Sequence, residues 1–476
     1  MKKSIISNYF YSVFYQTLLV IIPLVITPYT TRVLGETLLS INVGTANILQ
    51  WFALFGIMGI NVYGNREIGR VRDDNDLLSK TFLEIVSMQI LSFITMIILF
   101  LLYVTFIGDE YLNILIIQGF SLIATAIDIT WFFYGVEDFK KITIRNCFVK
   151  ILGVILIFTF VKSPDDFILF IIINISTMII GQFVMWLQLS SYIKFCKISL
   201  KGVLRHFIPN IHYFIPQLAI SVYSIMDVTM LRNLGKVAED VFFYEVTQKF
   251  IRIFLFFVTS IGTVMLPRLS NIYAKGKVDQ IQKYVNKTFK ISIYLAIPMI
   301  FGICVVVKGF IGWFLPVQSQ VVSDLIIIGS PLILLISLSN VFGAQYLLPV
   351  GNTKKYTTSV TIGAIVNFSI NLIIIPMLGA FGAIISSLIG ELAVTIYQWF
   401  VIRKSVSFYV SLRSIFNVIF SSVTMAIIVF MTYSFTTPSI LVTLFQGIIG
   451  IICYVIMLYL LKDPLLTEVI NLRKKS

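Results

Sequence analysis

Three charged residues, Glu245, Lys249 and Arg252, lie inside an otherwise apolar segment that is long enough to cross a bilayer. Their spacing of i, i+4 and i+7 places them on one face of an α-helix. Charges at this depth are costly and mark the path of a ligand or an ion. The two cations suit a phosphate or diphosphate, which Arg binds through its planar fork. The alternative is an intrahelical pair of Glu245 and Lys249, which leaves Arg252 without a partner nearby in the sequence.

A second polar stripe has the same spacing and consists of Glu391, Thr395 and Gln398. A carboxylate facing a cavity at this depth is a candidate carrier of a proton or a cation. The alternative is a protonated Glu391 that is hydrogen-bonded between helices. Asp128 and Glu245 are the other two acidic residues that we consider for ion coupling.

Four further residues are expected to line a cavity for a sugar and a diphosphate: Tyr15, Gln16, Arg32 and His212. Tyr15 and Gln16 belong to a polar face of the first apolar segment, and an aromatic ring can stack on a sugar. Arg32 follows the end of the same segment. For His212, a cavity-lining or interfacial position is expected rather than a catalytic one.

Charge-poor segments supply the elements that would position these residues. Of the 476 residues, 58% are hydrophobic and 12% are charged, against roughly 45–50% and 25% in soluble domains. About 20 apolar residues cross a bilayer once, and the segments are apolar on all sides, whereas barrel strands alternate. The prediction is an all-α integral membrane bundle of fourteen spans, at 8–31, 38–63, 81–107, 113–135, 147–161, 167–192, 207–231, 241–266, 289–307, 322–348, 356–376, 380–402, 414–434 and 439–461.

The basic residues are divided unevenly between the two sides of this predicted bundle. Twenty-nine of the 36 Lys and Arg residues, Arg145 included, fall on one side and five on the other. Glu84 is counted among the acids of the basic side. Because basic loops are retained in the cytoplasm, we expect a multi-pass protein of the cell membrane with both termini cytoplasmic. The formal charge of +14 then reflects topology and not a nucleic-acid partner.

The loops and motifs favour transport over catalysis. No outer loop is long enough to hold a catalytic domain, and a Gly-rich nucleotide loop is missing. The four cysteines lie far apart without the spacing of metal ligands. We therefore expect a transporter with no metal and no cofactor other than a coupling H⁺ or Na⁺. The alternative of a different class is a membrane polysaccharide polymerase or an acyltransferase.

Two short matches indicate an imperfect internal duplication. Residues 32–35 (RVLG) and 232–235 (RNLG) follow the first and seventh spans, and Lys-Lys pairs at 140–141 and 354–355 follow the fourth and tenth. A six-span repeat keeps its orientation in the membrane, as expected for two lobes that flank a central cavity. The predicted divisions are an N-terminal lobe at 1–200, a C-terminal lobe at 201–405, and a helix pair with a basic tail at 406–476.

Several motifs resemble, in order along most of the chain, the Wzx-type polysaccharide repeat-unit flippases of the multidrug/oligosaccharidyl-lipid/polysaccharide exporter superfamily. They lie at residues 8–16, 27–29 (TPY), 32–35, 128–131 (DITW), 135–141, 266–270 (LPRLS), 345–355 and 379–382, and at Glu391.

This resemblance implies two six-helix lobes around a cavity, followed by two C-terminal helices. It implies movement of an undecaprenyl-diphosphate-linked oligosaccharide from the inner to the outer leaflet, for the synthesis of capsule, O-antigen or exopolysaccharide. The implied partners are the lipid-linked substrate and the polymerase and glycosyltransferases of the same pathway.

Two other transporters remain open as alternatives. A lipid II flippase also has fourteen spans and shares the diphosphate and the prenyl tail of the cargo. A multidrug exporter of the same superfamily usually has twelve spans. A cavity for cationic drugs should be rich in carboxylates, so the pair Lys249 and Arg252 argues against that cargo.

Overall fold

The computed structural model of the protein describes residues 5–107, 110–274, 278–316, 320–403, 405–406, 411–435 and 437–464, and all regular secondary structure in these ranges is helical. Within these ranges, ten helices are long and apolar enough to cross a membrane, and one bent pair can form an eleventh crossing. The predicted all-α membrane fold is confirmed. Each predicted span coincides with a helix or a helix pair, while the total of fourteen crossings stays a prediction.

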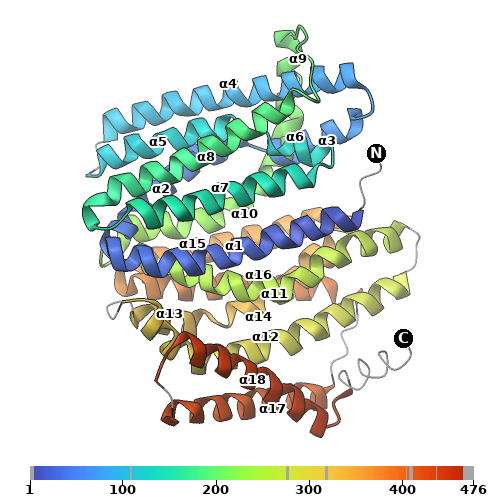
Figure 1. The fold of residues 1–476 in the computed structure, drawn as a ribbon. Coiled ribbons are helices and arrows are strands. Elements are labelled where there is room, and N and C mark those ends of the chain that lie inside the picture. The colour runs from blue at the N-terminus through green and yellow to red at the C-terminus, as the bar shows by residue number, and fades with distance from the viewer. Residues whose placement is uncertain are drawn as a thin grey trace. The chain divides into compact units, whose positions relative to one another are not determined.

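The chain forms two compact units, residues 1–232 and 233–476. The predicted lobe boundaries at residues 200 and 405 stay predictions. Figure 1 shows the helices of the first unit, which are α1 (Ile5–Leu34), α2 (Glu36–Ile57), α3 (Ile60–Val71), α4 (Asn75–Ile107), α5 (Leu112–Ala126), α6 (Thr130–Gly135), α7 (Phe139–Phe160), α8 (Phe167–Leu189), α9 (Leu200–Leu204) and α10 (Phe207–Leu234).

Two aromatic-rich cores hold the first unit together. One lies between α3, α4, α6 and α8 and buries Phe82, Trp131 and Phe132 almost completely. The other lies between α2, α4 and α5 and contains Leu49, Phe100 and Leu115. Large apolar side chains that are removed from solvent or lipid in this way fix how the helices pack against each other.

The helices extend beyond the apolar segments from which the spans were predicted. Helix α7 begins at Phe139, although hydropathy predicts a span only from residue 147. The added turns contain Lys140, Lys141 and Arg145, whose charge ends the hydropathy signal but which are good helix formers. Hydropathy therefore locates the membrane segment of a helix better than its ends.

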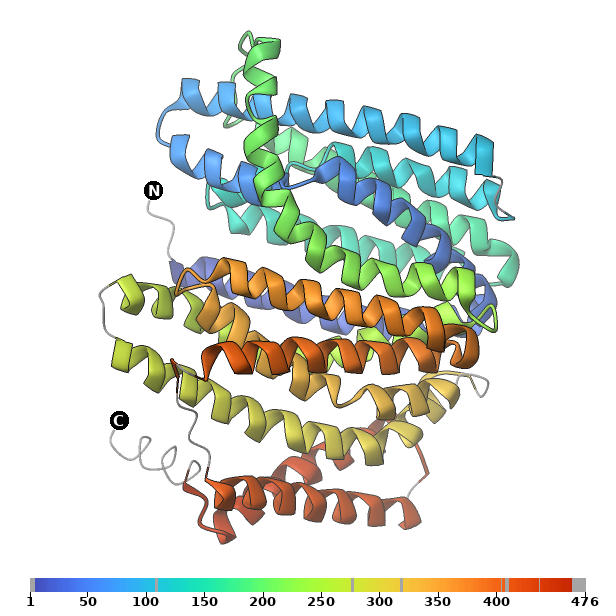
Figure 2. The same ribbon diagram turned by 180° about the vertical axis from the view of Figure 1, so that it is seen from behind.

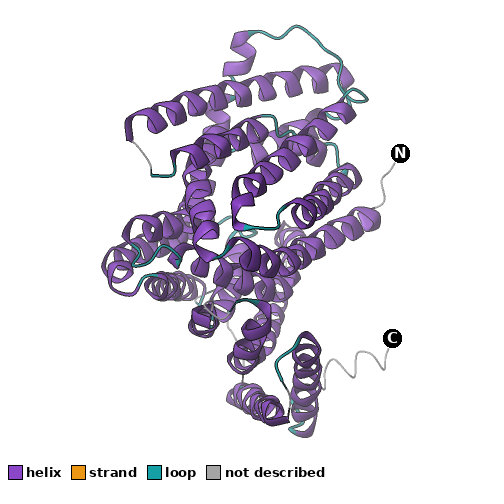
Figure 3. Ribbon diagram, turned by 60° about the vertical axis from the view of Figure 1, so that its left-hand side comes forward, coloured by secondary structure: helices purple, strands orange, loops and turns teal. Residues whose placement is uncertain are grey.

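The second unit contains α11 (Asp240–Ala274), α12 (Val278–Phe314), α13 (Gln320–Gly329), α14 (Leu332–Ser339), the π-helix η3 (Asn340–Leu347), α15 (Thr353–Leu378), α16 (Ala380–Ile402), α17 (Leu412–Met431) and α18 (Ile440–Leu460). Helices are joined by short loops, as Figure 3 shows. Helices α15 and α16 form an antiparallel hairpin, which is seen from behind in Figure 2.

A buried carboxylate sets the turn of this hairpin. Gly379 has a φ of +56°, and a Cβ atom there would lie 2.2 Å from Asp240 Oδ2, so a glycine is required. Asp240 Oδ1 accepts a hydrogen bond from the Ala380 backbone N–H at 3.1 Å. Its Oδ2 accepts from the backbone N–H groups of Lys236 at 3.0 Å and Val237 at 3.2 Å. One side chain thus caps α16 and fixes the loop before α11.

The last two helices are joined to α12 by specific polar contacts. Asp463, which is fully buried, accepts hydrogen bonds from the Tyr294 hydroxyl at 2.7 Å and from Asn417 Nδ2 at 3.0 Å. Farther along α12, Trp313 Nε1 donates to Thr443 Oγ1 at 2.9 Å. Helices α17 and α18 are therefore held at both ends of their contact with α12.

Candidate functional site

The three charges of α11 form one cluster, as their spacing predicts. Lys249 Nζ lies 3.5 Å from Glu245 Oε1, and Arg252 Nη2 lies 3.9 Å from Glu245 Oε2. The expectation that Arg252 has no partner nearby in the sequence is wrong, because its long side chain reaches back two helical turns. Two cations share one carboxylate, which leaves a net positive face on this helix. The side chains of Arg252 and Lys249 are 64% and 43% exposed, against 22% for Glu245.

The other residues predicted to bind substrate lie in the first unit. Arg32 is exposed near the end of α1, and its Nη1 donates to the Pro28 carbonyl at 3.2 Å. His212 is exposed on α10, with Nδ1 at 2.9 Å from the Ile208 carbonyl oxygen. Tyr15 and Gln16 belong to α1, but their side chains lie outside the described residues. The shared cavity of these residues with the α11 cluster stays a prediction.

Glu391 lies on a face of α16 that is turned toward neighbouring helices. The Ser339 hydroxyl donates to Glu391 Oε2 at 3.4 Å. One turn farther, the Thr395 hydroxyl donates to the Leu335 carbonyl at 3.2 Å, and Gln398 Nε2 donates to Ser359 Oγ at 2.9 Å. The predicted stripe therefore faces α14, η3 and α15. A hydroxyl that donates to a carboxyl oxygen fits both the charged and the protonated form of Glu391.

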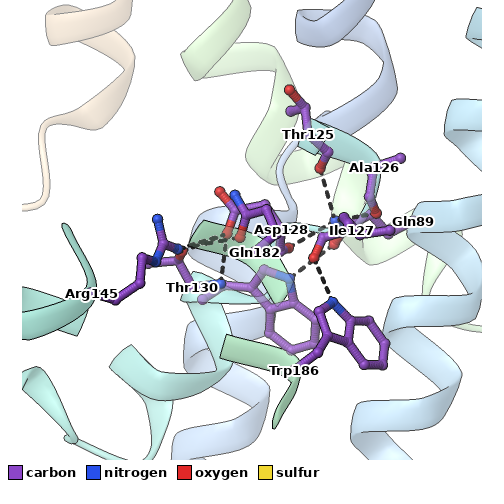
Figure 4. A network of polar contacts seen from close by, with 10 residues as sticks. Gln89, Thr125, Ala126, Ile127, Asp128, Thr130, Arg145, Gln182 and Trp186 are labelled. Atoms are coloured by element: carbon purple, nitrogen blue, oxygen red, sulfur yellow. Dashed lines mark hydrogen bonds and ion pairs between the residues drawn. The ribbon is translucent and has the colours of Figure 1, made fainter. Parts of the chain in front are cut away.

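Asp128 lies at a break in the fourth predicted span, between α5 and α6 (Figure 4). Its Oδ1 accepts from the backbone N–H of Thr130 at 2.8 Å and from the Thr130 hydroxyl at 2.5 Å. Arg145 Nη2 lies 3.9 Å from the same oxygen and also donates to Thr130 Oγ1 at 2.8 Å. The carboxylate thus starts α6 and neutralises a nearly buried guanidinium.

Gln89 of α4 hydrogen-bonds to the backbone at this break. Its Nε2 lies 2.9 Å from the carbonyl oxygens of Ala126 and Asp128, and its Oε1 accepts from Trp131 Nε1 at 2.9 Å. Trp186 Nε1 donates to the Ile127 carbonyl at 2.8 Å. A broken helix in a membrane frees backbone carbonyls that must find partners. Here long polar side chains from α4 and α8 supply them, as Figure 4 shows.

The sequence did not show that two charged residues are buried. Arg145, counted with the basic residues of one side, is a residue of α7 whose side chain is 10% exposed. Glu84, counted among the acids of the same side, is a residue of α4 with a side chain 1% exposed. Asp128 signals the need for a cation, but its spacing from Arg145 is no helical repeat. Only tertiary structure reveals that pairing.

A sequence model of the polysaccharide biosynthesis protein family matches residues 5–273, more than half of the chain. The chain belongs to this family. A second model, for the lipid II flippase MurJ, matches residues 253–454. This chain is 26% identical over 419 residues to the protein named "Putative O-antigen transporter" of Escherichia coli (strain K12). The alignment covers 85% of this chain and 98% of that relative.

Two solved structures share the fold of this family member. The lipid II flippase MurJ in an inward closed conformation aligns with a TM-score of 0.74 and 16% identity, over 96% of this chain and 99% of that one. An inward-facing MATE family multidrug resistance transporter of the MOP superfamily aligns with a TM-score of 0.60 and 11% identity, over 82% and 93%. The resemblance to Wzx-type flippases is confirmed, and the protein is a multi-pass membrane protein of polysaccharide biosynthesis. The relatives carry the names of transporters and flippases, in line with the predicted class.

Proposed function

We propose that this protein flips an undecaprenyl-diphosphate-linked oligosaccharide repeat unit from the inner to the outer leaflet of the cytoplasmic membrane, with both termini in the cytoplasm. The Escherichia coli relative, matched over most of both chains, supports a lipid-linked oligosaccharide as cargo. The polymer served would be capsule, O-antigen or exopolysaccharide, with the polymerase and glycosyltransferases of that pathway as partners. Alternating access between two lobes would carry the cargo across.

The observation that carries the proposal is the net positive cluster on α11. Glu245 contacts both Lys249 and Arg252 from one side, so the outer sides of the two cations remain available to a diphosphate. Arg binds such a group through two parallel hydrogen bonds, and Lys adds a point charge. Arg32 would add a third cation, while Tyr15, Gln16 and His212 would contact the sugar.

To test the role of this cluster, the double variant Lys249→Gln and Arg252→Gln is expressed in cells that lack their own flippase, and surface polysaccharide is measured. Charge-assisted hydrogen bonds contribute about 1.5–3 kcal/mol each, so surface polysaccharide should fall at least about tenfold at equal protein level. Arg72→Gln is the control, because it removes one cation from a 2.6 Å pair with Glu137 outside the spans. Full surface polysaccharide in the double variant would remove the diphosphate role from α11.

The second candidate cargo is lipid II, favoured by the MurJ model that matches residues 253–454. Both cargoes carry a diphosphate and a prenyl tail, so the α11 cluster serves either. Cells depleted of their lipid II flippase distinguish them. Growth restored by this protein would favour lipid II, whereas restored surface polysaccharide in the flippase mutant without restored growth in the depleted strain supports the repeat unit.

We further propose that Glu391 couples transport to a gradient of H⁺ or Na⁺. Of the three acids considered, Asp128 contacts Arg145 and Thr130, and Glu245 contacts two cations. The Glu391 carboxyl is contacted by one neutral hydroxyl, from Ser339. Since no cation contacts Glu391 among the residues that the structure describes, its charge is more easily neutralised by a proton or balanced by a metal ion.

A further inference from the structure

A buried polar cluster lies where the chain enters α10. Residues 190–206 connect α8 to α10 and contain the short helix α9; in the predicted topology they join the two repeats. Glu84 projects from α4 into this connection, and His206 is its last residue. Both are at most 5% exposed, and neither has a role in the proposed transport of the lipid-linked cargo.

Glu84 is held against the connection by two partners and by close packing. Its Oε2 accepts from Arg205 Nη2 at 2.6 Å and lies 3.2 Å from His206 Nε2. Its Oε1 has no hydrogen-bond partner among the described residues. A Cβ atom at Gly202 would lie 2.2 Å from that oxygen, so the carboxylate rests directly on the backbone of α9.

His206 continues this chain of contacts to α3. The hydroxyl of Tyr63 lies 2.6 Å from His206 Nδ1. Nε2 lies 3.2 Å from Glu84 Oε2 and 3.5 Å from Arg205 Nε. Because an ionised carboxylate only accepts and is the nearer group, we assign the imidazole proton to Nε2, and Nδ1 of the neutral ring then accepts from Tyr63. The neutral histidine therefore satisfies both neighbours, and the charges of Glu84 and Arg205 balance.

Protonation of His206 disturbs this arrangement in two ways. It adds a second cation beside Arg205 at a buried position, and it turns Nδ1 into a donor, so the Tyr63 hydroxyl must turn its own proton away and accept instead. Burial lowers the pKa of His206, Arg205 lowers it further, and Glu84 and the Glu67 of α3 oppose the decrease. The neutral form is thus favoured wherever the contacts exist.

A second contact holds the same connection. The backbone N–H of Lys194 donates to Ser79 Oγ of α4 at 3.0 Å. Gly59, between α2 and α3, lies so close to α10 that a Cβ atom would be 2.6 Å from the Asn210 carbonyl oxygen. The connection is therefore held against α4 and the start of α10 against the turn between α2 and α3, so these contacts must open before either can move.

We propose that Tyr63, Glu84 and His206 form a proton-operated latch, which holds the start of α10 against α3 and α4 while His206 is neutral and releases it when His206 takes up a proton. A released histidine has its usual pKa of about 6.5. Lowering the pH through this value favours the state that binds the proton more strongly, which is the released state. Release would free the first turns of α10 and the connection that precedes it.

Hydrogen exchange of the purified full-length protein tests the latch, with protection factors corrected for the intrinsic exchange rate at each pH. In the wild type, protection of the amides of residues 203–213 should fall up to about tenfold between about pH 7.5 and about pH 5.5. His206→Gln should remove this pH dependence. His212→Gln, which alters the other of the two histidines, should leave it unchanged.

Glu84→Ala should lower protection at both pH values, with α15 and α16 unaffected as the test of folding. If that variant cannot be purified, the comparison of wild type with His206→Gln decides alone. Equal protection of the wild type at the two pH values, or an unchanged pH response in His206→Gln, would overturn the latch.

Discussion

Two predicted spans that correspond in the internal repeat, the fourth and the tenth, are both broken. The polar groups that contact the backbone at the two breaks come from different places. In the fourth span, the break between α5 and α6 receives side chains from α4 and α8, and Asp128 is paired with Arg145. In the tenth span, α13 and α14 meet at an angle of 41° and continue into a π-helix. Broken helices at corresponding positions of two repeats point to the working part of a transporter.

The hydrogen bonds at the second break are formed mainly between residues of the same segment. Ser330 donates its hydroxyl to the Ile327 carbonyl at 2.9 Å, and Gln345 Nε2 donates to Asn340 Oδ1 at 3.0 Å. The contact with Glu391 is a single hydrogen bond of 3.4 Å from Ser339. The first break is thus fixed by tertiary contacts, whereas the second adjoins a carboxyl group with little to fix its charge. This difference agrees with the proposal that Glu391, and not Asp128, couples transport to an ion gradient.

The largest effect is expected from Gln89→Leu, which keeps volume but leaves the carbonyls of Ala126 and Asp128 and the indole N–H of Trp131 without their partner. Each buried donor or acceptor that loses its hydrogen bond costs about 1–3 kcal/mol. The free energy of unfolding, measured by denaturant titration in detergent, should therefore fall by about 3 kcal/mol or more.

Gln188→Leu is the matched control for this change, since Gln188 Oε1 has no hydrogen-bond partner among the described residues. An equal loss of stability in the two variants would show that the first break does not depend on Gln89.

An intermediate effect should distinguish the two acids. Asp128→Asn removes the carboxylate charge that lies 3.9 Å from Arg145 and should lower the free energy of unfolding by about 2 kcal/mol, a loss that the added change Arg145→Gln should partly restore. Glu391→Gln should lower it by less than about 1 kcal/mol, because a neutral amide can still accept from Ser339.

The same two variants should differ in the opposite sense in transport. Flipping in proteoliposomes by wild type and by Asp128→Asn should respond to an imposed pH or Na⁺ gradient, and flipping by Glu391→Gln should not. A Glu391→Gln protein with an unchanged gradient response would exclude this residue from coupling and leave the two breaks functionally alike.

The smallest effect is expected from Gly343→Ala in the π-helix. The added Cβ would lie 2.7 Å from Gln398 Nε2 and 2.8 Å from Tyr356 Cδ2, so side chains must shift at a cost of about 1 kcal/mol. Gly312→Ala in α12 meets nothing within 4 Å and should be neutral or stabilising by up to about 1 kcal/mol. Thermal unfolding of the pair measures the difference, and equal melting temperatures would show that the second break is loosely packed.

The hydropathy and the charge pattern of the sequence predict most of the helices, because a membrane-spanning helix must be apolar over its length. The length of each apolar segment predicts a helix there. The spacing of Glu245, Lys249 and Arg252 along one helix predicts that they lie together, as the structure confirms. The breaks at Asp128 and Ser330 were not predicted, since residues 113–135 and 322–348 each have the average hydropathy of one continuous span, although Asp128 and Pro331 lie inside them. At the first break, the groups that bind the freed backbone carbonyls are distant in the sequence, as Gln89 and Trp186 are, and periodicity carries no information about them.

The contacts of Asp463 bear on where this chain can be divided. A protein cut near residue 405 would keep Tyr294 on α12 but lose the carboxylate that its hydroxyl reaches, and Trp313 would lose Thr443. Each group would lose a hydrogen-bond partner, which is costly in a bilayer. Helices α17 and α18 are therefore part of the packing of the second unit, and a chain cut before them is expected to be less stable than the full chain.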